Sequence, residues 1–335
     1  MCAGRAPRTH PFFPASFDPG FQPGSKEIRE YNHCYNRIMD KTQLFGGIEA
    51  GGTKFICIVG SGPQQIEAQV RIETTTPDET LNKVVEFFRP YTKENSINAI
   101  GVGCFGPVDL DPDSKSFGYI TSTPKPGWQN TNVLGTLKRK LDVTVVMDTD
   151  VNAAAMGEFI WGVSKGSDPS LYLTIGTGIG GGYIKNAKPL MGLLSPEMGH
   201  IHVPHDLNLD PFQGSCPFHK DCFEGLASGP AVQKRFNVRG ETFSDDHPFW
   251  EIESGYIAAA LADYILVLSP RMIILGGGIM QRSILFPLIQ RKVPEILNSY
   301  VRSSSLVENI GKYIVPPGLG NQSGVLGALA LAQSI

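Results

Sequence analysis

The sequence predicts an α/β protein built from two similar halves, with a cleft between the two domains. Two observations lead to this fold class. Apolar stretches rich in β-branched residues alternate with stretches of helical spacing from residue 44 to the C-terminus. A strand, a glycine turn and a second strand occur near the start of each half, with glycine-rich stretches at 51–52 and 176–182. Such an internal echo is typical of a duplicated fold.

Length and composition limit the classes of function. The chain has 335 residues, of which 41% are hydrophobic and 18% are charged, which is enough for two packed domains. The formal net charge is −3 and no long basic block occurs, so nucleic acid is not expected as a partner. Gly, Pro or charge interrupts every apolar run before it reaches the length of a membrane span, so no membrane association is expected.

The first half is expected to contain an open mixed sheet. Its helical segment at 76–91 has Leu81, Val84, Val85 and Phe88 on one face. The expected strands are two within 44–60, then 65–74, 97–105 and 143–148, and the expected helices are 76–91, 133–141 and 151–161.

The second half repeats this theme after residue 170. Strands are expected at 171–175, 181–184 and 272–275, the last entering three glycines. A long helix is expected at 252–268, because apolar residues recur along it at helical spacing. Cys57 and Cys104 lie in apolar strand-like segments of the first half and are expected to be buried thiols.

Residues 1–43 differ from the rest and are expected to be a disordered extension. They are rich in Pro, Phe and Gly and lack the apolar core of a secretory signal. Arg5 and Arg8, with few acidic residues nearby, leave an organelle-targeting segment as an alternative, and Met39 is an alternative start. The expected domains are then 44–150, with the first glycine turn, and 151–335, with the second.

The two glycine turns predict a clamp for the phosphates of a nucleotide. The first is not a P-loop, because a strand rather than a helix follows it. Glycines let backbone N–H groups face an anion, and Thr53 and Lys54 add a hydroxyl and a positive charge. Either turn alone would be interpreted as an ordinary hairpin. The residues expected to contact ATP phosphates are Gly51, Gly52, Thr53, Lys54, Thr177 and Gly178.

A third glycine run is a candidate site for the adenosine. A strand that ends in three glycines allows a flat ring to lie on the backbone, although a tight strand-to-helix turn would explain it too. The candidate residues are Gly276, Gly277, Gly278, Ile279 and Met280.

Two carboxylates, Asp148 and Asp150, end a strand where a helix begins at once. Asp150 has two interpretations: it caps the helix, as Asp often does, or it is a general base. Phosphoryl transfer to a sugar hydroxyl needs one acceptor that orients the hydroxyl and takes its proton. The residues themselves leave both interpretations open.

Cys216, His219 and Cys222 are spaced closely enough for one loop to wrap a zinc ion. The alternative is a loop with two unrelated cysteines. A fourth donor is available from His200, His202 or His205. A complete Cys₂His₂ set leaves no open coordination position, so the zinc is expected to be structural.

Together these motifs resemble the ROK family of sugar kinases and repressors, within the actin-like ATPase (ribonuclease H-like) fold, from about residue 44 to the C-terminus. Residues 49–54 and 174–182 resemble the two phosphate motifs of the family. Residues 148–152 are similar to its catalytic segment, and the resemblance places the general base on Asp150.

The resemblance also implies the sugar side of the site. Glu197 and His200 stand in a segment similar to the family's sugar-contact signature, and Asn130 lies in a further sugar-side segment. It also makes His200 the fourth zinc ligand and places Pro230 beside ATP. The histidine at 219, where glucokinases of the family carry a cysteine, is typical of the fructokinase branch.

The resemblance therefore implies a cytoplasmic fructokinase that uses ATP, Mg²⁺ and structural Zn²⁺ to make fructose 6-phosphate, and that forms a homodimer. Its small-molecule partners are a hexose and ATP. A glucokinase or mannokinase of the same family is an alternative, because one pocket can accept several hexoses. A sugar-sensing regulator is another, although no recognition-type helix appears before residue 44. An actin-like ATPase with a protein client would leave the zinc loop and residues 197–200 without a purpose.

Overall fold

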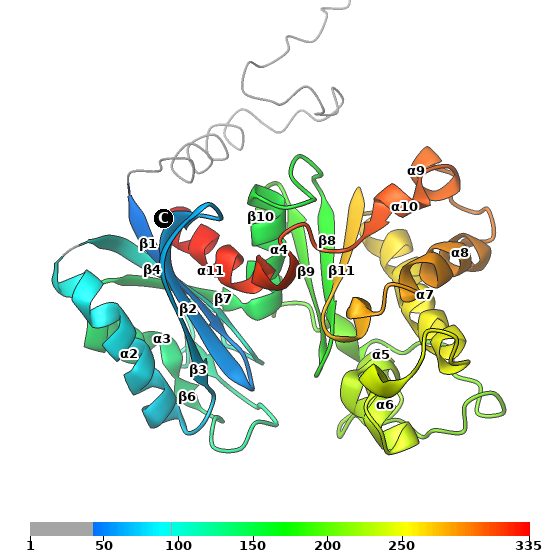
Figure 1. Ribbon diagram of the computed structural model, residues 1–335, viewed down its shortest axis with the longest axis horizontal. Coiled ribbons are helices and arrows are strands. Elements are labelled where there is room, and N and C mark those ends of the chain that lie inside the picture. The colour runs from blue at the N-terminus through cyan, green and yellow to red at the C-terminus, as the bar shows by residue number, and fades with distance from the viewer. Residues whose placement is uncertain (1–42, 95) are drawn as a thin grey trace, which may run out of the picture.

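The computed structural model describes residues 43–94 and 96–335, and it contains two five-stranded sheets of the same topology (Figure 1). In each sheet, two antiparallel pairings on one side are followed by two parallel pairings on the other. The predicted duplicated α/β fold is thereby confirmed. The predicted disorder of residues 1–43 falls almost entirely outside the described residues.

The first sheet has the strand order β3-β2-β1-β4-β7. Its strands are β1 Leu44–Ala50, β2 Lys54–Gly62, β3 Gln65–Glu73, β4 Ile97–Cys104 and β7 Thr144–Thr149. Helices α2 Pro77–Lys93 and α3 Val133–Leu141 cover one face and share a core with it. A short ribbon of β5 Tyr119–Ile120 and β6 Thr131–Asn132 carries the loop at 121–130.

The second sheet has the order β10-β9-β8-β11-β12. Its strands are β8 Ser170–Ile175, β9 Ile179–Lys185, β10 Lys188–Pro189, β11 Met272–Gly276 and β12 Ile314–Val315. The helices on its outer side are α5 Phe223–Ala227, α6 Gly229–Phe236, α7 Phe249–Leu268, α8 Leu285–Leu297, α9 Ser304–Val307 and α10 Ile310–Tyr313 (Figure 1).

Helices α4 Asp150–Ile160 and α11 Ser323–Gln333 lie between the two sheets (Figure 1). Glycines let these layers approach each other closely. A Cβ atom added to Gly327 of α11 would lie 1.7 Å from the carbonyl oxygen of Ala153 in α4. One added to Gly101 of β4 would lie 1.9 Å from the carbonyl oxygen of Ala328 in α11. The last helix therefore packs on the first sheet, and the predicted division of the chain at residue 150 stays a prediction.

The helix predicted at 252–268 begins earlier, at Phe249. Phe249 and Trp250 are buried among aromatic side chains of the preceding segment, including Phe243, so tertiary packing extends the helix. Cys57 and Cys104 are buried free thiols, as predicted. No helix within the described ranges is both long and apolar enough to traverse a bilayer.

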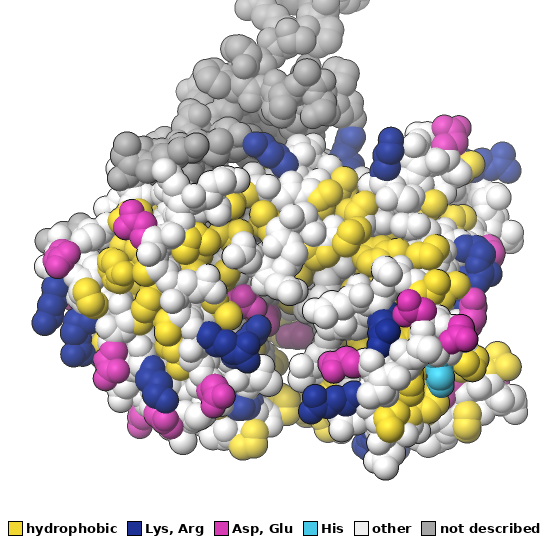
Figure 2. Space-filling model, in the orientation of Figure 1, with side chains coloured by type: hydrophobic (Ala, Val, Ile, Leu, Met, Phe, Trp, Pro, Cys, Tyr) yellow, Lys and Arg dark blue, Asp and Glu magenta, His cyan; other side chains and the backbone are white. Residues whose placement is uncertain are grey.

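The two halves leave a hollow between them on the face shown in Figure 2. Asp and Glu side chains lie at its inner end, and Lys and Arg side chains lie along its rim. A recessed site of this kind suits a polar ligand that is held from both sides.

Candidate active site and metal centre

The turn from β7 into α4 positions Asp150. The N-cap of α4 is Thr149, whose Oγ1 accepts a hydrogen bond from the N–H of Asn152 at 3.1 Å. Asp150 is the first residue of the helix, and its Oδ1 accepts from the N–H of Val151 at 2.9 Å. The interpretation of Asp150 as the helix cap is therefore wrong, because Thr149 performs that function.

The surroundings of Asp150 suit a proton acceptor. Burial, and next the negative charge of Glu49, raise the pKa of Asp150 to about 7, against a smaller lowering by the Val151 N–H. Glu197 adds a further negative charge that raises this pKa. The residue as a whole is half-buried. A base with a pKa near the working pH combines an available unprotonated form with a strong pull on a proton.

Glu49 begins the segment 49–54 that resembles the first phosphate motif, but no role of its own was predicted for it. It lies on β1 opposite Gly103 of β4, which in turn pairs with Asp148 of β7. Burial raises the pKa of Glu49, whereas Lys54 and the N–H of Val325 at the start of α11 lower it. An acidic residue at the strand end before a glycine turn is the sequence signal that would have identified it.

The first glycine turn is a tight hairpin held by the end of β3. The N–H of Gly51 donates to the carbonyl oxygen of Lys54 at 3.0 Å. Thr74, directly after β3, stabilises the turn, because its Oγ1 donates to the carbonyl oxygen of Gly51 at 2.7 Å. Thr53 is exposed, and a Cβ atom at Gly52 would meet no atom within 4 Å, so this side of the turn has room for a ligand.

The second glycine turn joins β8 to β9. The N–H of Gly176 donates to the carbonyl oxygen of Gly178 at 2.9 Å, and Thr177 is exposed at the tip. The strand that follows packs on α4, since a Cβ atom at Gly180 would lie 2.9 Å from Cγ1 of Val151. The second turn and the helix that begins at Asp150 are thus neighbours.

The third glycine run lies beside the second turn. Gly277 has φ +93°, and a Cβ atom there would lie 2.3 Å from the carbonyl oxygen of Ile175. The N–H of Gly229, which precedes the exposed Pro230, donates to the carbonyl oxygen of Gly176 at 2.8 Å. The fold therefore brings together three segments at which nucleotide contacts were predicted.

Ile279 and Met280 differ from the other predicted adenosine contacts. Their side chains are 8% and 5% exposed and belong to the core of the second half. A contact of these residues with a nucleotide would therefore use the backbone. The glycines 276–278 have no side chain, so they too could contact a nucleotide only through the backbone.

The predicted sugar contacts come from both halves. Glu197 stands directly before the short 3₁₀ helix Met198–His200 in the second half. Partial burial raises the pKa of Glu197, His200 lowers it and Glu224 raises it. Asn130 lies in the first half, exposed, with φ +56°, and its N–H donates to the carbonyl oxygen of Thr121 at 3.3 Å. Its position beside the other sugar contacts stays a prediction.

Four candidate metal ligands form one cluster: His200, Cys216, His219 and Cys222. Their ligand atoms all lie within 4.8 Å of one another. Nδ1 of His200 is 3.6 Å from Sγ of Cys222 and 3.8 Å from Sγ of Cys216, and Nδ1 of His219 is 3.8 Å from Sγ of Cys216. Tetrahedral zinc with ordinary Zn–S and Zn–N bonds would separate S and N ligands by about 3.5 Å. The cluster fits a zinc ion.

The chemistry of the two thiols also fits a cation. Burial and the neighbouring Cys216 raise the pKa of Cys222 to about 11. A bound metal ion would supply a positive charge that favours the thiolate form of Cys222.

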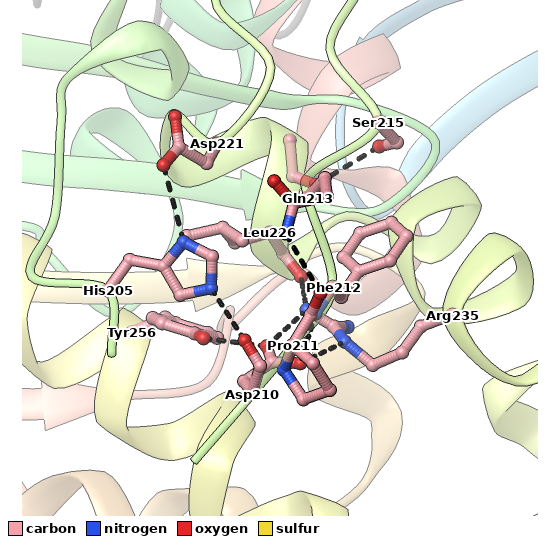
Figure 3. Close-up of polar contacts among 11 residues, drawn as sticks. His205, Asp210, Pro211, Phe212, Gln213, Ser215, Asp221, Leu226, Arg235 and Tyr256 are labelled. Carbon is pink, nitrogen blue, oxygen red and sulfur yellow. Dashed lines mark hydrogen bonds and ion pairs between the residues drawn. The ribbon is translucent and has the colours of Figure 1, made fainter. Parts of the chain in front are cut away.

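His205 is engaged elsewhere, in a polar network that supports the metal loop (Figure 3). Its Nδ1 is 3.3 Å from Oδ2 of Asp221, and its Nε2 is 3.0 Å from the carbonyl oxygen of Asp210. Asp210 accepts hydrogen bonds from Arg235 at 2.9 Å and from Tyr256 at 2.7 Å. Although burial opposes it, these donors hold the pKa of Asp210 below its usual value. The network ties the segment before the metal loop to α6 and α7.

Asn152 ends the segment 148–152 that resembles the catalytic segment, and it is another residue to which no role of its own was assigned. Its side-chain amide donates to Oδ1 of Asp148 at 2.7 Å and to Oγ of Ser195 at 3.3 Å. Ser195 lies two residues before Glu197, so this amide links the end of β7 to the segment with the predicted sugar contacts. Its place three residues into the helix gave no signal of that contact.

Comparison with known proteins identifies relatives over most of the chain. The family model described as the ROK family matches residues 45–335. A putative fructokinase of Bacillus subtilis (strain 168) is 50% identical over 86% of this chain and 95% of its own length. A fructokinase of Lactococcus lactis subsp. cremoris is 45% identical over 87% of this chain and 97% of its own. The solved ROK hexokinase of Thermus thermophilus has a TM-score of 0.70 at 24% identity, over 87% of this chain and 98% of that structure.

Proposed function

Because the chain belongs to the ROK family, we propose that it is an ATP-dependent fructokinase in which Asp150 is the general base. Its two matching sheets form the actin-like ATPase fold. Relatives at 50% and 45% identity that are named as fructokinases support fructose as the hexose. One structural observation carries the assignment of the base. The charge of Glu49, which stands before the first glycine turn, raises the pKa of Asp150, and the next residue, Val151, packs against Gly180 just after the second turn.

The proposed reaction is an in-line transfer of the γ-phosphoryl group. The 6-hydroxyl oxygen of fructose forms a bond to the γ-phosphorus, the bond to the bridging oxygen breaks, and ADP leaves. The hydroxyl proton passes to the carboxylate of Asp150. Mg²⁺ bound with ATP would supply positive charge against the charge that develops on the phosphate oxygens. Closure of the predicted units 44–150 and 151–335 would exclude water and so suppress hydrolysis of ATP.

The nucleotide is proposed to bind along the three glycine segments. Backbone N–H groups of the first turn and of Thr177 and Gly178, together with Lys54, would hold the phosphates. The run that begins at Gly276 would line the adenosine, with Pro230 at its edge. The support is the proximity of the second turn to Gly229 and Gly278, whose backbones lie against Gly176.

The sugar is proposed to bind against Glu197, His200, Asn130 and Asp150. His200 would bind zinc through Nδ1, which faces the two thiols, and would keep Nε2 for a sugar hydroxyl. Four protein donors leave the zinc no open position, so its role is to fix the loop rather than to activate a substrate. The zinc loop and the sugar segment would then be held as one unit.

A hexose panel tests the proposal. Purified protein with MgATP is given D-fructose, D-mannose or D-glucose, and ADP release is followed in a coupled assay. We expect the highest kcat/KM with D-fructose. A higher kcat/KM with glucose or mannose would refute the assignment of fructose as the preferred hexose. ADP release that does not depend on any hexose would refute the assignment as a sugar kinase.

Assembly and location belong to the same proposal. We expect a homodimer in the cytoplasm, on the family resemblance. Light scattering on the purified protein measures the mass of the assembly. A mass of one chain at micromolar concentration would contradict the homodimer.

A further inference from the structure

Glu224 connects the metal loop to the second glycine turn. It lies in the first turn of α5, whose N-cap is the metal-cluster residue Cys222. Its Oε2 accepts a hydrogen bond from the N–H of Ile179 at 2.9 Å, where the chain leaves the turn for β9. A Cβ atom at Gly178 would lie 2.9 Å from the same oxygen, so the carboxylate packs directly against the turn.

The same segment also holds the other end of the turn. Helix α5 ends at Ala227, and the N–H of Ser228 donates to the carbonyl oxygen of Glu224 at 3.1 Å. The next N–H, that of Gly229, donates to the carbonyl oxygen of Gly176 at 2.8 Å. Residues 224–229 therefore contact the turn where it begins and where it ends.

The other side of α5 is anchored to the metal loop. The N–H of Phe223 donates to the carbonyl oxygen of Ile201, next to His200, at 2.8 Å. The N–H of Ser215, next to Cys216, donates to the carbonyl oxygen of Gly225 at 2.9 Å. The start of α5 thus lies between the segments that carry the metal ligands, and a metal that joins those segments would fix the direction of this short helix.

We propose that Glu224 is a positioning residue through which the bound metal holds the second glycine turn in the shape that binds nucleotide. The inference rests on the proposed function, which places zinc in the cluster and ATP phosphates at the turn. A carboxylate that accepts from a backbone N–H makes a charge-assisted bond, stronger than one between neutral groups. Loss of the metal should therefore weaken nucleotide binding, although none of the four candidate metal ligands is among the proposed nucleotide contacts.

The test is a thermodynamic cycle on the affinity for Mg²⁺ and AMPPNP, measured by isothermal titration. Replacing Glu224 with Ala should raise the Kd on the order of tenfold, the usual cost of losing a hydrogen bond to a charged group. Removing zinc from the wild-type protein with a chelator should raise it by a similar factor. Removing zinc from Glu224→Ala should add little, because the connection is already broken.

Matched variants separate this role from general damage. Glu224→Gln keeps an acceptor oxygen and should retain most of the affinity. Glu308→Ala removes an exposed carboxylate at the end of α9 and should change nothing. Zinc content and the far-UV circular dichroism spectrum of each protein are measured in parallel. If the zinc-free wild type unfolds, the test rests on the AMPPNP Kd of the zinc-loaded Glu224→Ala protein. An AMPPNP Kd equal to that of the wild type then overturns the inference.

Two other results would also overturn it. One is a Glu224→Ala protein whose fructose Kd rises while its AMPPNP Kd stays the same. The other is a cycle in which the effects of zinc removal and of the substitution simply add. Wild-type protein that holds no zinc would instead refute the zinc site of the proposed function, and wild-type protein that binds no AMPPNP would refute the proposed kinase activity.

Discussion

Replacing Glu49 with Gln tests whether the charge at the end of β1 sets the pH at which Asp150 works. The pKa of Asp150 is raised to about 7, first by burial and then by Glu49. A general base must be unprotonated, so kcat/KM should rise with pH. With this pKa, the unprotonated fraction is about 0.1 at pH 6 and about 0.9 at pH 8, so the wild type should gain roughly tenfold between them.

Glu49→Gln removes a negative charge that disfavours the carboxylate, so the pKa of Asp150 should fall and the acidic limb should move to lower pH. At pH 6 the variant should then lose a smaller part of its maximal kcat/KM than the wild type loses. Because burial is the larger cause of the raised pKa, the apparent pKa of this limb should stay above the ordinary pKa of Asp, about 3.9.

The assay is ADP release at saturating MgATP with fructose varied from pH 5 to 9, with coupling enzymes in excess at each pH. Glu67→Gln, an exposed glutamate on β3, is the matched control and should leave the limb in place. A wild-type profile that is flat from pH 6 to 8, or a limb that does not move in Glu49→Gln, would refute the reasoning.

Three further predictions follow from contacts within the fold. Asp150→Asn should lower kcat by about 10² to 10⁴, with AMPPNP affinity by titration within about twofold of wild type; retained turnover would exclude this base. Gly101→Ala places a Cβ atom 1.9 Å from the backbone of α11, so in urea unfolding it should lower the free energy of unfolding by about 1 to 3 kcal/mol or more. Gly62→Ala is the control: its Cβ atom would meet no atom within 4 Å, so the free energy of unfolding should stay unchanged. Arg235→Met leaves the buried carboxylate of Asp210 without its positive partner and should cost about 3 to 5 kcal/mol in the same measurement. A change below about 1 kcal/mol would contradict that account.

Local sequence was sufficient to locate most elements and the main motifs. Glycine turns between β-branched strands define the hairpins β1–β2 and β8–β9, because their patterns depend only on neighbours in the chain. The three donors at 216–222 likewise stand within one loop, so their spacing alone indicated a metal. The apolar spacing of α2 and the position of Asp150 where β7 passes into α4 were also visible in the chain.

The tertiary structure decided what depends on residues far apart in the chain. Thr149 caps α4, so Asp150 does not have to. Glu49 lies near Asp150, about a hundred residues later, only because β4 places the ends of β1 and β7 in register. His205 is held by Asp221, and His200 instead joins the metal cluster. These outcomes follow from packing, burial and long-range hydrogen bonds, whose energies depend on three-dimensional distance and leave no periodic trace in the sequence.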